Sequence, residues 1–102
     1  MAHDRERRCR HRQMVAAEVD FRRPREPRHP VPLRDLSPEG CRIGSRLRLD
    51  RGELVWVRLP SLESLPAWVR WAGELESGVE FDRPMHVAVY AMIAGRLARG
   101  GG

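Results

Sequence analysis

The sequence predicts an all-β domain with one helix, a six-stranded antiparallel β-barrel followed by a C-terminal α-helix. Three observations predict this fold class. Several short segments alternate apolar and polar residues with a period of two, which is the spacing of half-buried strands. Turn residues separate those segments, and no helical pattern falls between them. After Pro84 the apolar period changes to about 3.6 residues, which indicates an amphipathic helix.

The first half of the barrel is predicted from alternation and from turn residues. The first strand is carried by Val15, Ala17, Val19 and Phe21. The prolines and charges of residues 22–30 exclude a central strand and indicate an exposed loop. A short strand then returns at Val31 and Leu33, and residues 35–40 follow it as a turn.

The second half of the barrel follows the same reasoning. Cys41 and Ile43 predict a third strand, with Leu47 as its furthest candidate. Residues 50–52 predict a turn, and the fourth strand is carried by Val55, Val57 and Leu59. Residues 65–84 are typical of a hairpin, with glycines between two arms whose apolar residues are Trp68, Val69, Trp71, Val79 and Phe81. We expect the tryptophans to lie in the core or in an interface.

The last element is a single helix whose apolar face is Met85, Val89, Met92, Ile93 and Leu97. We expect it to cover one side or one opening of the barrel and to stop at Gly100–Gly102. The domain organisation that follows is a flexible arginine-rich arm at residues 1–12, the barrel with its helix at 13–98, and a disordered tail at 99–102.

Composition favours binding over catalysis. At 102 residues the chain fits one domain, and its 19 basic residues are all arginine, against 14 acidic residues and a net charge of +5. The guanidinium fork suits phosphate, carboxylate or a guanine edge, although most of these arginines also serve as a solvated surface. No nucleophile motif, phosphate loop or paired carboxylates are recognisable, so we expect no catalytic residue and no enzyme.

Cysteine and histidine usage excludes two further classes. Cys9 and Cys41 make no disulfide framework, and we interpret both as reduced thiols. The four histidines lack metal-ligand spacing, so no metal is expected.

No apolar stretch has the length of a membrane span or the pattern of a signal peptide, and we expect a cytoplasmic protein.

Two short motifs carry the functional hypothesis. Arg8 and Arg12 form Arg-x-x-x-Arg, and after 22 residues Asp35, Ser37 and Gly40 form Asp-x-Ser-x-x-Gly. In this order and spacing, and with Gly-Val-Glu-Phe at residues 78–81, the chain resembles the PilZ family over roughly residues 5 to 97. The resemblance implies a six-stranded barrel with a C-terminal helix, and cyclic di-GMP as the ligand.

The resemblance assigns a role to each residue of the two motifs. Arg8 and Arg12, with Arg10 as an additional contact, are expected to bond phosphates or the O6 and N7 acceptors of guanine. Asp35 is expected to accept from the N1 and N2 donors of guanine. Ser37 offers a hydroxyl to the ligand or to its own turn, and Gly40 permits a backbone angle or a close approach that a side chain would block.

The function predicted from this resemblance is a cyclic di-GMP receptor that needs no cofactor. Its arm orders around the nucleotide and thereby changes a surface that an effector protein recognises. One alternative is an interaction adaptor of the same fold that does not bind nucleotide. Another is a nucleic-acid-binding barrel, suggested by the basic arm and the least favoured of the three.

Overall fold

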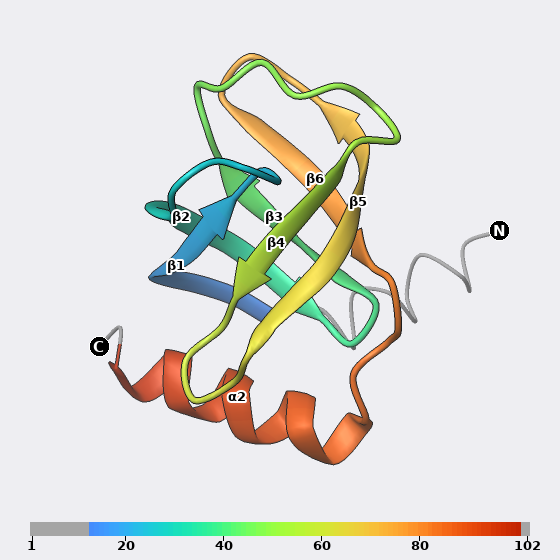
Figure 1. Cartoon of the computed structure of the whole chain (residues 1–102). Helices are drawn as coiled ribbons and strands as arrows, with labels where there is room; N and C mark the ends of the chain where they lie inside the picture. The colour runs from blue at the N-terminus through green and yellow to red at the C-terminus, as the bar shows by residue number, and fades with distance from the viewer. Residues whose placement is uncertain (1–12, 101–102) are drawn as a thin grey trace, which may run out of the picture.

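The computed structural model describes residues 13–100, which form a closed antiparallel barrel and a helix (Figure 1). In chain order the elements are β1 (Gln13–Arg22), β2 (His29–Ser37), β3 (Gly40–Gly44), β4 (Leu54–Arg58), β5 (Ser64–Ala72), β6 (Glu76–Phe81) and α2 (Val87–Gly100). The strands follow the spatial order β1-β2-β3-β6-β5-β4, and β4 pairs back with β1 to close the barrel. The predicted fold class is confirmed.

Irregularities in three strand pairs accompany the closure of so small a sheet. The register shifts between Met14 and Ala17 on β1, between Leu33 and Asp35 on β2, and between Val69 and Trp71 on β5. A bulge bends its strand and increases the local twist, which brings β1 and β4 into contact around Phe21 and Val57.

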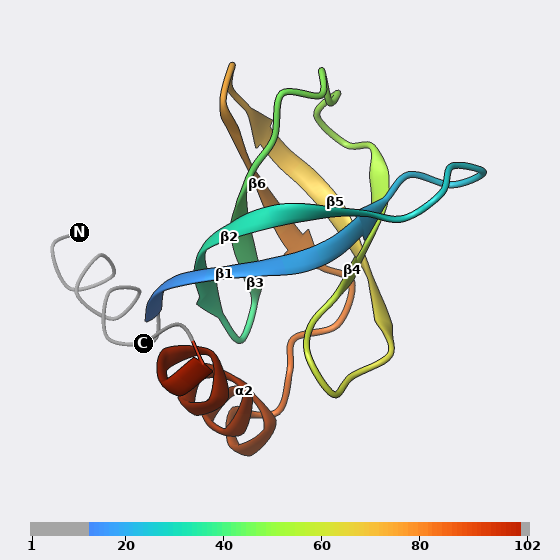
Figure 2. The same ribbon diagram turned by 90° about the vertical axis from the view of Figure 1, so that its left-hand side faces the viewer.

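The core fills the barrel with inward-facing aliphatic and aromatic side chains. Its fully buried members include Phe21, Leu33, Leu36, Ile43, Val55, Val57, Leu59, Val69 and Ile93. Helix α2 lies across one end of the barrel, at the bottom of Figure 1, and Figure 2 shows it beneath β1. Its packed face has helical spacing and consists of Tyr90, Ile93, Ala94 and Leu97.

Several predicted details were wrong. Met85 was expected on the helix but precedes α2. Met92 was expected on the packed face but is 45% exposed, because that face is centred on Tyr90, Ile93, Ala94 and Leu97. Leu47 lies outside β3. Strand β2 continues through Ser37, so Asp35 and Ser37 are strand residues and the turn is Pro38–Glu39 alone. The helix ends at Gly100, where the glycines were expected to stop it, and so includes residues 99 and 100, which the expected boundary had assigned to the tail.

Candidate functional site

The Asp-x-Ser-x-x-Gly motif forms the end of the β2–β3 hairpin. Leu33 and Leu36 are both buried in the core, because the bulge of β2 lies between them. Asp35 therefore lies on the other face of the sheet, opposite Arg42 of β3. Val31 and Leu33 face the core, and continuing their alternation by two residues would place Asp35 in the core as well. The sequence pattern of β2 therefore does not predict the outward position of Asp35.

Asp35 is a buried carboxylate with an arginine counter-ion. Its side chain is 3% exposed, and its Oδ2 lies 3.2 Å from Nε of Arg42. Nη1 of Arg42 donates to Oε1 of Glu76 over 3.2 Å, so one guanidinium joins carboxylates from β2 and β6. Because a buried charge is tolerated only when paired, Arg42 is a counter-ion that compensates the burial of the Asp35 carboxylate.

Sequence reasoning missed Arg42, although a signal for it exists. A two-residue turn at Pro38–Glu39 pairs Ser37 with Gly40 and, two steps further, Asp35 with Arg42. Counting the register outward from that turn would have selected this arginine from the other arginines.

Ser37 closes the turn of the hairpin. Its buried hydroxyl donates to the carbonyl oxygen of Gly40 over 3.3 Å. The turn is also held from outside, since the backbone N–H of Phe81 donates to the carbonyl of Glu39 and that of Met85 donates to the carbonyl of Pro38, both over 2.8 Å. Ser37 thus has a structural role within the described residues.

Gly40 is required by the close approach of β3 and β6. A Cβ at this position would lie 2.1 Å from the carbonyl oxygen of Val79 and 3.0 Å from the Cα of Glu80. Both neighbours are backbone atoms that cannot rotate away, so a side chain at Gly40 would push the strands apart. The close approach expected at this glycine is therefore made by the chain itself.

A row of four residues crosses the outer face of the sheet from the motif. Asp35 pairs with Arg42, Arg42 with Gly78, and Gly78 with Trp71. The Trp71 indole lies over Gly78, whose Cβ would meet its Nε1 at 2.2 Å. Trp71 remains 45% exposed. The row therefore aligns a carboxylate, a guanidinium and an aromatic ring.

A second row lies beside the first and ends in another exposed tryptophan. Gly40 pairs with Glu80, and Glu80 with Trp68, which is 37% exposed. Nε1 of Trp68 donates to Oδ1 of Asp82 over 3.1 Å. Of the two places expected for the tryptophans, the core is excluded for Trp68 and Trp71, because outward positions of β5 carry them, and an interface stays a prediction.

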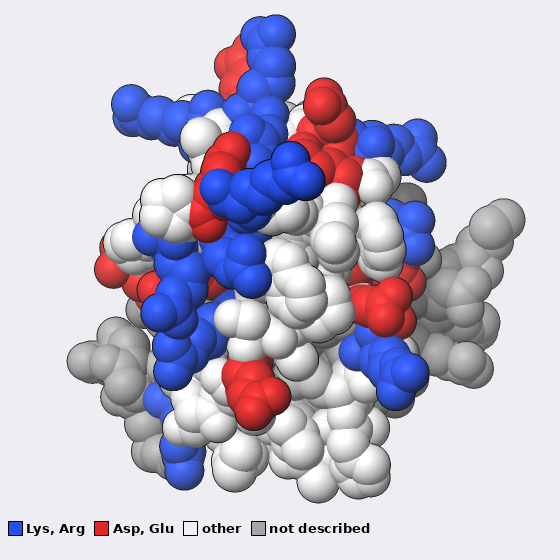
Figure 3. Space-filling model, in the orientation of Figure 1, with Lys and Arg blue, Asp and Glu red and all other residues white. Residues whose placement is uncertain are grey.

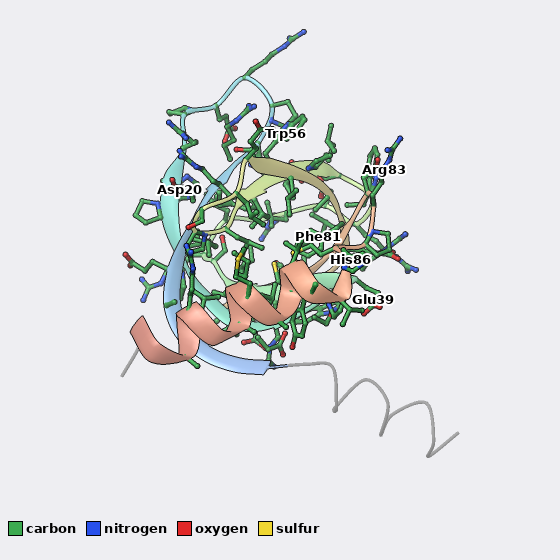
Figure 4. All side chains as sticks on the ribbon, turned by 90° about the horizontal axis from the view of Figure 1, so that it is seen from below. Asp20, Glu39, Trp56, Phe81, Arg83 and His86 are labelled. Atoms are coloured by element: carbon green, nitrogen blue, oxygen red, sulfur yellow. The ribbon has the colours of Figure 1, made fainter. Side chains whose placement is uncertain are left out.

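The charge of Asp35 also reaches side chains of the core. Burial, and secondly the charge of Asp35, raise the pKa of the Cys41 thiol to about 12. Burial raises the pKa of Tyr90 on α2, followed by the charges of Asp35 and Glu39. Figure 4 shows Glu39 near His86 at the end of the molecule where α2 begins. The charge of Asp35 therefore acts on Cys41 of the hairpin and on Tyr90 of the helix. Because its pKa is raised, the Cys41 thiol stays protonated at neutral pH.

Three further expectations can be compared only with the part of the chain that the structure describes. Arg8, Arg10 and Arg12 lie outside the described residues, so the structure brings together only Asp35, Ser37 and Gly40 of the predicted site. Residues 13–100 contain no group of three His, Cys, Asp or Glu side chains that suits a metal ion. In that same part of the chain, no helix has the length and apolar character of a membrane span.

The motif, the barrel and the terminal helix agree with a known domain family. The model of the PilZ domain matches residues 6–98. The chain belongs to the PilZ family. Among solved structures, this PilZ domain is similar to the crystal structure of the Borreliella burgdorferi PlzA protein in complex with c-di-GMP, with a TM-score of 0.59 and 13% sequence identity. The match covers 84% of this chain but 39% of that chain, so the likeness concerns the fold of one part of PlzA. No curated protein matches the sequence.

Proposed function

We propose that this PilZ domain binds cyclic di-GMP on the outer face of the barrel, beside the β2–β3 turn. The observation that carries the proposal is the row Asp35–Arg42–Gly78–Trp71, which starts at the family motif. Asp35 offers an acceptor for the N1 and N2 donors of guanine, and the arginine offers a donor fork to O6, N7 or phosphate. Trp71 offers an exposed ring on which a base can stack.

Family membership and the likeness to a PlzA structure that contains c-di-GMP support this ligand. In the proposal, Arg8 and Arg12 contact phosphates or guanine, and Arg10 is an additional contact. Their ordering around the nucleotide would change the surface that an effector protein recognises. The proposed role is binding, and no residue is assigned to catalysis.

The adaptor alternative is supported by a separate observation. Within the described residues, Ser37 and Gly40 are explained by the turn and by the contact of β3 with β6, with no ligand. Asp35 is the residue of the motif that the turn does not require, which makes it the most informative position to replace.

The test is a calorimetric titration of cyclic di-GMP into the full chain, with GTP as a competitor. The variants are Arg12→Ala and Asp35→Asn, and Arg51→Ala is the control because Arg51 is an exposed arginine away from the motif. A charged hydrogen bond contributes about 1.5–3 kcal/mol, so each test variant should weaken binding by roughly tenfold or more. Tryptophan fluorescence provides a second readout through Trp71. If folded wild-type protein gives neither heat nor a fluorescence change, the adaptor alternative replaces the proposal.

A further inference from the structure

The described chain separates its charge between two regions. Residues 22–28 and 45–53, which we call the basic end, contain seven arginines and three carboxylates, a net charge of +4. The rest of residues 13–100 contains seven arginines and nine carboxylates, a net charge of −2. Five arginines of the basic end are exposed, namely Arg25, Arg28, Arg46, Arg48 and Arg51. Figure 3 shows basic side chains gathered toward the top and left of this face, with carboxylates among them.

The two loops of the basic end are fastened to each other by Arg23. Its Nε lies 2.7 Å from Oε2 of Glu53, and its Nη2 donates to the carbonyl of Arg48. Glu53 also accepts from the backbone N–H of Asp50 over 2.9 Å. Glu53, one of the three carboxylates of this surface, is thus engaged in the contacts that hold the loops. The exposed arginines are displayed on a connected scaffold.

An exposed leucine lies next to the β3–β4 loop, which carries Arg46, Arg48 and Arg51. The backbone N–H of Ser45 donates to the carbonyl of Leu75 over 2.9 Å, which places the β5–β6 turn against the β3–β4 loop. Both lie at the end of the barrel away from α2 (Figure 1). Leu75 is 65% exposed, the most exposed of the large apolar side chains described. An exposed leucine beside a basic surface is the combination that peripheral membrane proteins use.

We propose that the basic end and Leu75 dock on an anionic membrane surface. Lipid phosphates match the arginines in charge, and the interfacial region accepts an apolar side chain. A nucleic acid is less favoured because residues 22–28 and 45–53 contain no aromatic residue to stack on a base. A protein interface is less favoured because the core of such an interface is depleted in charge. Leu75 precedes Glu76, which bonds Arg42 of the Asp35 row, but no arginine of the basic end belongs to that row, so this inference does not depend on nucleotide binding.

The experiment is co-sedimentation of the full chain with vesicles of phosphatidylcholine alone or mixed with phosphatidylglycerol, at low and at high salt. The test variants are Arg46→Glu/Arg48→Glu and Leu75→Ser. The control is Arg83→Glu/Arg96→Glu, which makes the same change of net charge at exposed residues outside the basic end. A duplex DNA oligonucleotide is titrated alongside.

Wild-type protein should bind the phosphatidylglycerol vesicles, and salt should weaken this binding. Since each basic residue near an anionic surface contributes roughly fivefold, the loss of Arg46 and Arg48 should weaken binding by about 25-fold or more. Leu75→Ser should weaken it severalfold, and the control should retain most of it. The proposal is overturned by absent binding at low salt, by equal losses in test and control variants, by an unaffected Leu75→Ser, or by tighter binding to the DNA that depends on Arg46 and Arg48.

Discussion

Arg42 of β3 lies opposite Asp35 of β2, with its Nε 3.2 Å from Oδ2 of the buried carboxylate. The same guanidinium bonds Glu76 on the next strand of the barrel. An arginine outside the family motif therefore links the motif carboxylate to a neighbouring strand. In the proposed function, the pair connects stability with ligand recognition, because both need the Asp35 carboxylate held in place.

Replacing Arg42 with alanine should destabilise the domain by about 1–3 kcal/mol, since it leaves the buried Asp35 without this counter-ion. It should also weaken the proposed binding of cyclic di-GMP. Urea unfolding gives the first quantity and calorimetry the second. Arg34→Ala is the matched control, because Arg34 is the exposed arginine that precedes Asp35. Equal effects of the two variants would show that the Asp35–Arg42 pair has no special role.

Gly40→Ala should destabilise the domain by more than about 2 kcal/mol. The added Cβ would overlap the carbonyl of Val79 at 2.1 Å, and strands β3 and β6 would have to separate. Gly52→Ala is a useful comparison because Gly52 has φ +88° and a Cβ added there would meet no atom within 4 Å. Its cost should be only about 1 kcal/mol of backbone strain. Thermal unfolding of both variants would reveal whether crowding or backbone conformation costs more.

Ser77→Ala should stabilise the domain by up to about 1 kcal/mol. Ser77 is fully buried on β6, and its hydroxyl has no hydrogen-bond partner within the described part of the chain. Removing such a hydroxyl abolishes its desolvation cost and leaves little empty volume. Ser45→Ala should have the opposite sign, because the Ser45 hydroxyl accepts from the backbone N–H of Leu47 over 3.0 Å. Chemical denaturation gives the free energy of unfolding of each variant. A lower value than wild type for both Ser77→Ala and Ser45→Ala would contradict this account of Ser77.

Much of the barrel could be predicted because its strands alternate regularly, as Val31 and Leu33 on β2 do. The prediction failed where a bulge interrupts the alternation, so the strand character of Asp35 and Ser37 was missed. The outward position of Trp71 depends on Gly78, a partner from another strand that periodicity along one strand does not reveal. Arg42 was missed because an arginine-rich sequence provides many equivalent candidates, and only register selects one.

The residues of the Asp-x-Ser-x-x-Gly motif could be recognised in the sequence, but the structural role of each residue could not be fully predicted. Ser37 was expected to bond the ligand or its own turn, and Gly40 to permit a backbone angle or a close approach; the described contacts give them roles in the turn and in strand packing, and their contact with a ligand stays a prediction. The role of Gly40 depends on Val79, which lies far along the sequence. Long-range approach of this kind cannot be read from local residue preferences.

The buried Cys41 predicts how stability depends on alkaline pH. Burial and the charge of Asp35 raise its pKa from 9.0 to about 12. Between these values the unfolded chain loses the thiol proton while the folded chain keeps it, so the unfolded state binds fewer protons and stability falls as pH rises. Tyr90 shifts in the same direction and adds to this loss. We therefore expect the urea midpoint to decline above about pH 9, and Cys41→Ala to decline less steeply than wild type although it starts lower.

In a Cys9→Ser background, where Cys41 is the remaining thiol, a disulfide reagent at pH 8 should react slowly with folded protein and rapidly in urea. Fast reaction of the folded protein would show that Cys41 is neither buried nor held protonated.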